Sequence, residues 1–393
     1  MRQTDVAITG TGLVTPAGLS PAEAFAAIAE GGTTHGKPSS FDAGGFLCKA
    51  AGEVRDSRIE TLIRDRKAVR LMGRDAVLAA AAARLAMLDS GLNIGSNCEP
   101  EDVALFGATG TAGLPFGEIE SLVRGSTDSR GRFDLRLFGE QGLRQTRPVI
   151  SFKILSNMAI CFVSIFENIQ GPNLIFNPWE GQGALAIREA ARCVAGGGAR
   201  FALAGGCDCK THGIAFATLQ QHGMFDSWRR SERGMVPGEG AAFLLLESLE
   251  TARERGCRIY GVLRGAGHSS DLDAASRHSS NPQPLAGAMK EAISHAEKRP
   301  GVVFSSLDGD DVGDACELEA LRQAEVEDLP RLATKPVLTN VFAAAAAANL
   351  CMAAHAVSGG EFPEGGKQPD SRGALVNCFG PGTEKVAFIL EAP

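Results

Sequence analysis

Polar aromatic side chains are scarce in this chain of 393 residues. It has one tyrosine and two tryptophans beside 20 phenylalanines. Most of its aromatic surface therefore lacks a hydroxyl or ring N–H that must find a partner when buried. Hydrophobic residues make up 44 % of the chain, which excludes a disordered protein. We interpret this composition as material for a large, dry interior.

The sequence also lacks an apolar run strong enough to cross a membrane. The nearest candidate, 341–357, is mostly alanine and too weakly hydrophobic, so we expect a helix packed inside the protein. The start of the chain leads directly into a strand-like segment and has no signal-peptide pattern. We therefore predict a cytoplasmic protein without a membrane span.

Basic residues do not outnumber acidic ones. Lys and Arg number 39 against 46 Asp and Glu, for a net charge of −7, which argues against nucleic acid as a partner. The ten cysteines contain no CxxC pair, and without a secretory signal we expect them to be reduced. Cys207 and Cys209 form the one close pair, and buried small residues explain it better than a metal, so we predict no metal site.

Glycine, by contrast, is abundant, at 48 residues, and it gathers at the ends of strand-like runs. Continuous apolar strands alternate with helical patterns, which predicts buried, parallel-rich α/β sheets covered by helices. A strand, a loop and a helix near 174–195 are echoed near 302–324, as two related halves would produce. The helical pattern over 59–88 predicts one long helix.

Four motifs occur in a fixed order along the chain. They are ITGTGLVTP at 8–16, NMA at 157–159 with GPN at 171–173, FD at 225–226 with RGMVPGEGA at 233–241, and NCFGPG at 377–382. Together they resemble the β-ketoacyl-acyl-carrier-protein synthases (ketosynthases) of the thiolase superfamily. The resemblance implies a five-layer αβαβα fold made of two similar halves, 1–250 and 251–393, that dimerises by pairing a central strand.

The same resemblance implies a substrate and a set of catalytic positions. The substrate is an acyl chain on the phosphopantetheine of an acyl carrier protein, so the chain itself needs no cofactor. Active ketosynthases use a cysteine at a helix N-terminus and two histidines that stabilise the enolate and oxyanion. Counting from the flanking motifs, Glu180 stands at the cysteine position, and Asp308 and Asn340 stand at the histidine positions.

Two further residues match retained positions of the family: Lys335 and Glu319. A glutamate cannot form the thioester intermediate. We expect Glu180 and Asp308 to lie close together, so that one pKa rises unless Lys335 pairs with them. The interpretation is a degenerate site held together by hydrogen bonds rather than a working pair of carboxylates.

A ketosynthase-like chain without the cysteine resembles the chain-length factor of type II polyketide systems, in which glutamine is common at that position. The resemblance implies a subunit, inactive alone, that pairs with a catalytic ketosynthase paralogue in polyketide, aryl-polyene or fatty-acid-like elongation. Two alternatives stay open. One is an acyl- or malonyl-carrier-protein hydrolase or decarboxylase that uses Glu180 and Asp308 as acid and base, and the other is an acyl-binding homodimer.

Three more groups of residues take their expected roles from the resemblance. Phe152, Asn157, Phe162 and Phe166 are expected at the dimer seam, where they would wall an acyl tunnel. Ordinary core packing is the alternative for each phenylalanine. The gating loop is expected at Phe379, Gly380, Pro381 and Gly382. Docking of the acidic carrier protein is expected at Arg66, Lys67 and Arg70, and a solvated helix face is the alternative.

Overall fold

A computed structural model describes residues 5–111, 116–146, 148–274, 277–359 and 373–393. Within these residues, ten strands form one mixed sheet in the order β3-β2-β4-β5-β1-β6-β10-β9-β7-β8. The strands are β1 (Val6–Val14), β2 (Val103–Thr109), β3 (Asn173–Phe176), β4 (Phe201–Cys209), β5 (Glu239–Ser248), β6 (Gly261–Ser270), β7 (Val302–Ser305), β8 (Arg331–Ala333), β9 (Gly373–Cys378) and β10 (Glu384–Glu391).

Helices lie on both faces of this sheet. The α-helices are α1 (Pro21–Ala29), α2 (Ile59–Leu62), α3 (Arg74–Ser90), α4 (Phe116–Gly125), α5 (Leu135–Leu137), α6 (Ser151–Ile154), α7 (Met158–Glu167), α8 (Glu180–Ala195), α9 (Gly213–Gln221), α10 (Asp226–Ser231), α11 (Leu249–Arg255), α12 (Gln283–Ile293), α13 (Asp311–Gln323), α14 (Lys335–Leu338) and α15 (Ala345–Val357). Tighter or wider turns are η1 (Ala68–Leu71), η2 (Pro100–Asp102), η3 (Phe138–Gly142), η4 (Leu143–Gln145), η5 (Pro148–Ile150), η6 (Leu272–Ala274) and η7 (Phe342–Ala344).

The sheet consists of two halves that have the same pattern of strand pairing, in reversed order along the sheet. In the first, β2 pairs in parallel with β3 and β4, while β5 pairs antiparallel with β4 and β1. In the second, β7 pairs in parallel with β8 and β9, while β10 pairs antiparallel with β9 and β6. The halves join where Val6–Ile8 of β1 pairs with 261–263 of β6. The division into domains at residue 250 stays a prediction, since the two halves share one sheet.

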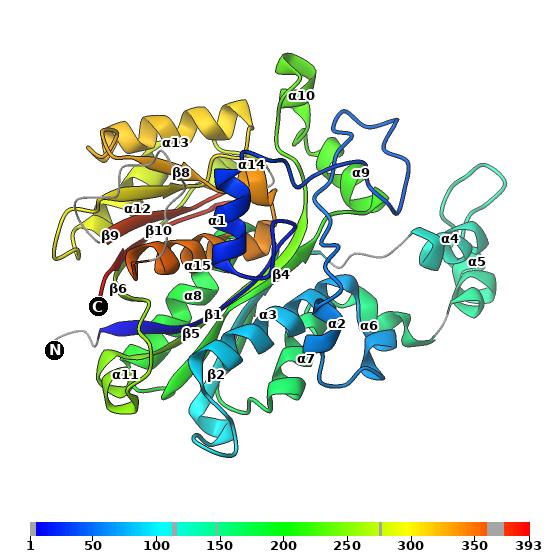
Figure 1. The fold of residues 1–393 in the computed structure, drawn as a ribbon. Helices are drawn as coiled ribbons and strands as arrows, with labels where there is room; N and C mark the ends of the chain where they lie inside the picture. The colour runs from blue at the N-terminus through cyan, green and yellow to red at the C-terminus, as the bar shows by residue number, and fades with distance from the viewer. Residues whose placement is uncertain (1–4, 112–115, 147, 275–276, 360–372) are drawn as a thin grey trace.

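This correspondence between the halves differs from the internal repeat that we expected between 174–195 and 302–324. β3 and α8 correspond to β8 and α15, not to β7 and α13, because β3 and β8 are the two outermost strands. The helices that follow them, α8 and α15, pack against each other between the two halves of the sheet (Figure 1). A short strand such as β8 has too little apolar sequence to be predicted by pattern.

Five layers follow from these positions (Figure 1). α3 and α7 cover the outer face of the first half, α8 and α15 fill the middle, and α12 and α13 cover the outer face of the second half. Side chains of β5 alternate between cores, since Leu244 and Leu246 face the middle layer and Leu245 faces α3. The predicted αβαβα fold is confirmed.

Small residues allow the middle layer to pack closely. The alanine-rich segment forms η7 and α15, and nearly all of α15 is buried, as the composition predicts. A methyl group on Gly183 of α8 would lie 2.3 Å from the Ala343 carbonyl oxygen, so only glycine fits there. Among the described residues, no helix combines the length and apolar character needed to cross a bilayer.

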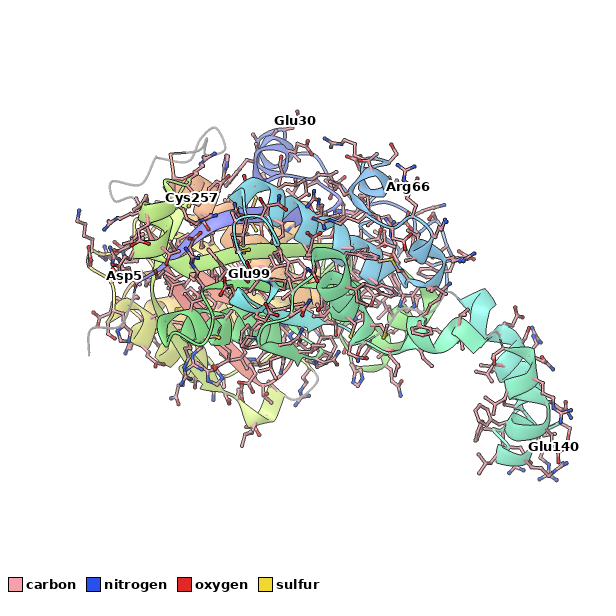
Figure 2. All side chains as sticks on the ribbon, turned by 90° about the horizontal axis from the view of Figure 1, so that it is seen from below. Asp5, Glu30, Arg66, Glu99, Glu140 and Cys257 are labelled. Carbon is pink, nitrogen blue, oxygen red and sulfur yellow. The ribbon has the colours of Figure 1, made fainter. Side chains whose placement is uncertain are left out.

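Two segments differ from a simple layered protein. The single helix expected over 59–88 is wrong, because α2 ends at Leu62 and α3 begins only at Arg74, after an extended Gly73. The segment from α4 to η4 projects away from the body, with Glu140 near its end (Figure 2). Among its described residues, four large apolar side chains are exposed: Val123, Phe133, Leu135 and Leu143.

Candidate functional site

Glu180 is the first residue of α8, and its carboxylate is almost fully enclosed, at 1 % exposure. Lys335 Nζ donates a hydrogen bond of 2.6 Å to Glu180 Oε2, and Ser306 Oγ lies 2.9 Å from Oε1. The backbone N–H groups at a helix N-terminus favour a negative charge at this position. The carboxylate is therefore held by an ion pair, a hydroxyl and the end of a helix.

Lys335, the first residue of α14, joins three separate segments. Besides Glu180, its Nζ donates to the carbonyl oxygens of Ser306, at 2.9 Å, and Phe379, at 3.4 Å. A methyl group on Gly380 would lie 3.3 Å from Glu180 Oε2. The residues expected to form the gating loop, 379–382, are buried, and Gly380 among them lies beside Glu180.

Asp308 and Asn340, expected at the two histidine positions, contact each other. Asn340 Nδ2 donates to Asp308 Oδ2 at 2.7 Å, and the Asp310 N–H donates to Asp308 Oδ1 at 3.1 Å. The loop side chain that contacts Glu180 is Ser306, two residues earlier than Asp308. Asp308 is expected to lie close to Glu180, and its charge does act on the pKa of Glu180, but the loop side chain that hydrogen-bonds to Glu180 is Ser306.

Glu319, which motif spacing matches to the family's acidic position, lies outside this buried cluster. It lies on the exposed face of α13 and pairs with Arg322 at 2.6 Å. Glu317 is the buried acid: it accepts hydrogen bonds from Ser305 Oγ at 2.8 Å, the Ser306 N–H at 3.0 Å and Asn377 Nδ2 at 2.7 Å.

The helix pattern of α13 contains a signal that motif spacing missed. Gly313, Cys316, Ala320 and Leu321 are its small or apolar buried positions. Residue 317 falls on that face, one turn before 320 and 321, while residue 319 does not. Ser306, Glu317 and Asn377 are thus members of the site that the sequence analysis did not find.

Burial shapes the protonation of this site. It raises the pKa of Glu180 to about 7, although the charge of Lys335 acts in the opposite direction. Burial also raises the pKa of Glu317, against its hydrogen bonds from Asn377 and Ser306. For Lys335, burial lowers the pKa, but the charges of Glu180 and Asp308 outweigh it and the net shift is upward. The single positive charge of Lys335 lies near the carboxyl groups of Glu180, Asp308 and Glu317 and cannot neutralise all three.

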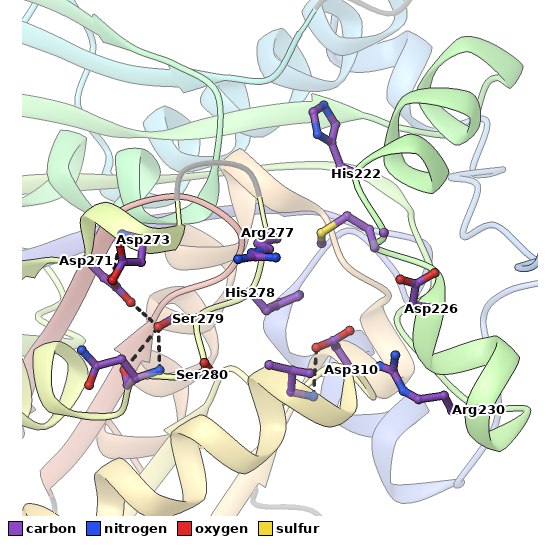
Figure 3. A pocket seen from close by; sticks show the side chains of 14 residues that line it. His222, Asp226, Arg230, Asp271, Asp273, Arg277, His278, Ser279, Ser280 and Asp310 are labelled. Atoms are coloured by element: carbon purple, nitrogen blue, oxygen red, sulfur yellow. Dashed lines mark hydrogen bonds between the residues drawn. The ribbon is translucent and has the colours of Figure 1, made fainter.

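A cavity of about 450 Å³ lies beside the site and is drawn in Figure 3. We call it the Asp308 cavity because Asp308, which does not line it, contacts its lining residue His278. Its lining includes Asp271, His278 and Asp310, together with Asp226 and Arg230 of α10. The His278 side chain is buried, and its Nε2 lies 3.7 Å from Asp308 Oδ2. His278 and Asp308 thus connect the cavity with Asn340.

The expected tunnel residues lie on α6 and α7. Phe162 is buried against the core under α3, and its ring centroid lies 5.8 Å from that of Phe166. Phe152 and Asn157 are exposed. None of the four lines the Asp308 cavity. Their role at a dimer seam stays a prediction.

The basic segment separates into two groups. Arg58, Arg64 and Arg74 pair with carboxylates of Glu23, Glu167 and Glu239. Arg66, Lys67 and Arg70 are exposed and make no ion pair within the described part of the chain. These three are the residues expected to bind a carrier protein.

Comparison with known proteins identifies the family of this chain. Residues 3–252 match the family described as "Beta-ketoacyl synthase, N-terminal domain". The chain is 28 % identical over 319 residues to "3-oxoacyl-[acyl-carrier-protein] synthase 2" of Coxiella burnetii, covering 78 % of this chain and 72 % of that protein. The protein of the same name from Rhizobium meliloti is 28 % identical over 381 residues, covering 90 % and 86 %.

Solved structures share the fold. A β-ketoacyl synthase from Burkholderia phymatum superposes with a TM-score of 0.83 at 21 % identity, covering 99 % of this chain and all of that one. The ishigamide ketosynthase/chain length factor gives 0.80 at 22 %, and a type II PKS acyl-carrier protein in complex with its ketosynthase gives 0.80 at 19 %, with full coverage of both chains each time. With the matched family covering more than half of its length, this chain belongs to the β-ketoacyl synthases.

Proposed function

We propose that this chain is the non-catalytic, chain-length-factor-like subunit of a heterodimeric type II β-ketoacyl synthase. Its catalytic paralogue would elongate acyl chains carried on an acyl carrier protein. The observation that carries this proposal is Glu180 at the start of α8, buried and bound by Lys335 and Ser306. A carboxylate in this place cannot act as the thiolate that forms a thioester.

The surface around β3 supports a partner subunit. β3 lies at one end of the sheet and exposes Leu174 at 47 %. Ile165 of α7 is 67 % exposed, and Phe152 and Ile154 of α6 are also exposed. Large exposed apolar surface is typical of protein interfaces. A similar solved protein is a ketosynthase/chain length factor, which favours a paralogue as the partner.

The exposed cations Arg66, Lys67 and Arg70 support binding of an acidic carrier protein. We expect Lys67→Glu with Arg70→Glu to weaken carrier binding by the heterodimer about tenfold at low salt, and the loss to shrink as salt increases. The matched control is Arg253→Glu, an exposed arginine of α11. Equal carrier affinity for the double variant and the control would count against docking at this segment.

A second candidate function has one observation in its favour. The pKa of Glu180, near 7, suits a general acid or base, and Asp308 lies between this region and a cavity. Hydrolysis or decarboxylation of an acyl- or malonyl-carrier protein by this chain would use that property. Against it, both oxygens of Glu180 already have partners.

One experiment separates these candidates. The chain is expressed alone and with a catalytic ketosynthase paralogue, incubated with malonyl- and acyl-carrier protein, and the carrier-bound products are followed by mass spectrometry. We expect elongation only with the paralogue, and we expect it to survive Glu180→Gln, which keeps the shape of the side chain. Turnover by the chain alone that is lost in Glu180→Gln would overturn the proposal, and tight acyl binding by a homodimer would favour the acyl-binding alternative.

The proposed tunnel has its own test in the product length. Phe162→Ala and Phe166→Ala are assayed in the heterodimer, beside Phe133→Ala on the projecting segment as a control. We expect the first two to shift the distribution of chain lengths and the control to leave it unchanged. An unchanged distribution in all three would assign Phe162 and Phe166 to ordinary core packing.

A further inference from the structure

A cavity of about 520 Å³, which we call the Arg258 cavity, lies between the end of α3, the loop after α11 and the residue before β4. It shares no lining residue with the Asp308 cavity. β2 pairs in parallel with both β3 and β4, so the start of β4 and the end of β3 lie at opposite edges of the sheet. Because Glu180 follows β3, the cavity is separate from that site. Cys257, which lines the cavity, lies at the end of the molecule away from Glu140 (Figure 2).

Three arginines line the Arg258 cavity, and each lies against an aromatic ring. The guanidinium carbons of Arg200 and Arg255 are 5.1 and 5.4 Å from the centroid of the Phe201 ring. That of Arg258 is 4.3 Å from the centroid of the Tyr260 ring. Such contacts are favourable for a planar guanidinium group. The rings therefore favour one position for each positive charge around the cavity.

Only one of these arginines has a carboxylate partner within the described residues. Arg255 pairs with the buried Glu247 at 3.1 Å, and its Nη2 also donates to the Ser90 carbonyl oxygen at 3.0 Å. Arg200 and Arg258 are exposed and have no such partner in that part of the chain. Their two charges are therefore available to a ligand.

The acidic residues near the cavity do not take up these charges. Among the described residues, Asp89 is the one carboxylate in the lining. Its Oδ2 accepts the Thr11 N–H at 2.8 Å, and its Oδ1 accepts the Tyr260 hydroxyl at 2.8 Å. Glu99 and Asp102 act on the region through their charges but do not line the cavity. The lining thus keeps an excess of positive charge.

We propose that the Arg258 cavity binds a small molecule that carries a phosphate monoester. The phosphate oxygens would accept hydrogen bonds from Arg200 and Arg258, because the planar guanidinium fork matches that group and a dianion offsets both charges. The organic part would contact Leu88, which lines the cavity and is 53 % exposed. The cavity volume is in the range of small-molecule sites. This site does not depend on the function proposed above.

The test is calorimetric titration of the full-length chain with phenyl phosphate, benzoate and phenol at pH 8 and low salt. We expect phenyl phosphate to bind most tightly, and its affinity to fall as salt increases. Arg200→Gln and Arg258→Gln each remove one exposed cation and its donors. We expect each of them to weaken phenyl phosphate binding about tenfold. Leu88→Glu brings a negative charge into the cavity and should abolish binding, whereas Leu88→Gln should keep most of it.

Arg253→Gln is the matched control, because it removes the same charge from an exposed arginine of α11 that does not line the cavity. Unchanged affinity in this variant assigns the ligand to the Arg258 cavity. The proposal is overturned if phenyl phosphate does not bind at millimolar concentration, or if benzoate or phenol binds as tightly. It is also overturned if Arg200→Gln and Arg258→Gln keep the affinity of the unaltered chain, if Leu88→Glu still binds, or if Arg253→Gln loses as much affinity as they do.

Discussion

Among the described residues, two buried lysine–carboxylate pairs differ in how far apart in sequence their partners lie. Lys210 and Asp208 lie two residues apart at the end of β4, with Nζ 2.5 Å from Oδ1. Lys335 and Glu180 are separated by 155 residues and come from different halves of the sheet. The first pair closes one strand end, whereas the second connects α8, α14 and the loops at 306 and 379.

The surroundings of the two lysines differ in the same way. Asp208 has a further donor in the Cys209 N–H at 2.8 Å, and Lys210 Nζ lies 5.6 Å from the centroid of the Phe342 ring. Lys335 lies among the carboxyl groups of Glu180, Asp308 and Glu317, which all act on its pKa. The two pairs have similar Nζ–O distances, but only the long-range pair connects segments that are far apart in the sequence. We therefore expect it to contribute more to the stability of the fold.

The largest effect is expected for Lys335→Met. It leaves buried carboxyl groups without their cation, so we expect the free energy of unfolding to fall by about 3–5 kcal/mol in chemical denaturation at pH 8. The loss should be smaller at pH 5, where Glu180 can take up a proton. The double variant Lys335→Met with Glu180→Gln should regain part of the stability. A loss below about 1 kcal/mol at pH 8 would show that the Lys335–Glu180 pair contributes little to stability.

Lys210→Met is expected to cost less, about 3 kcal/mol at most, because only one carboxylate pairs with that lysine and the Cys209 N–H still binds it. The measurement is the same denaturation series, with Lys210→Met and Asp208→Asn combined as the control. If Lys210→Met costs more than Lys335→Met, the local pair is the stronger support of the fold.

Glu180 should make stability depend on pH. Its pKa rises from 4.5 in the unfolded chain to about 7 in the folded protein, so the folded state binds the proton more tightly. The stabilisation is complete below pH 4.5 and disappears as pH rises through 7, by about 3 kcal/mol. Glu180→Gln should remove this part of the slope between pH 5 and 8. Asp314, whose pKa burial also raises to about 7, contributes to the slope that remains.

The smallest effect is expected for Ser306→Ala, which removes one hydrogen bond to Glu180 and keeps the ion pair. We expect a loss of about 1 kcal/mol and a further rise in the pKa of Glu180. The pKa can be followed by carboxyl carbon chemical shifts. Ser294→Ala, on the exposed end of α12, is the control. Stability and pKa that both match the control would remove Ser306 from the site.

Much of the fold could be predicted from the sequence, since apolar strands, glycine ends and the alanine-rich helix follow from local patterns. Glu180 could also be placed, because the motif before it is close in sequence and α8 begins at that residue. Motif spacing selects Asp308 and Glu319, whereas Ser306 and Glu317, each two residues earlier, make the buried contacts with Glu180 and Asn377. The loop after β7 has no hydrophobic periodicity, so the pattern cannot show which loop residue enters the site. In α13, only the helical pattern of buried residues indicates that Glu317 rather than Glu319 is buried. Ser306 contacts Glu180, and Asn377 contacts Glu317, across 60 residues or more of sequence, which no local pattern encodes.

The pairing of β1 with β6 has a consequence for how the chain folds. β1 occupies the middle of the sheet, yet its two neighbours, β5 and β6, lie more than 220 residues later in the sequence. During synthesis this apolar strand is made first, and it stays unpaired until β5 and β6 have been synthesised. Contacts of such long sequence separation slow folding and leave strand edges open to other chains. We expect N-terminal fragments that end before β5 to aggregate rather than fold.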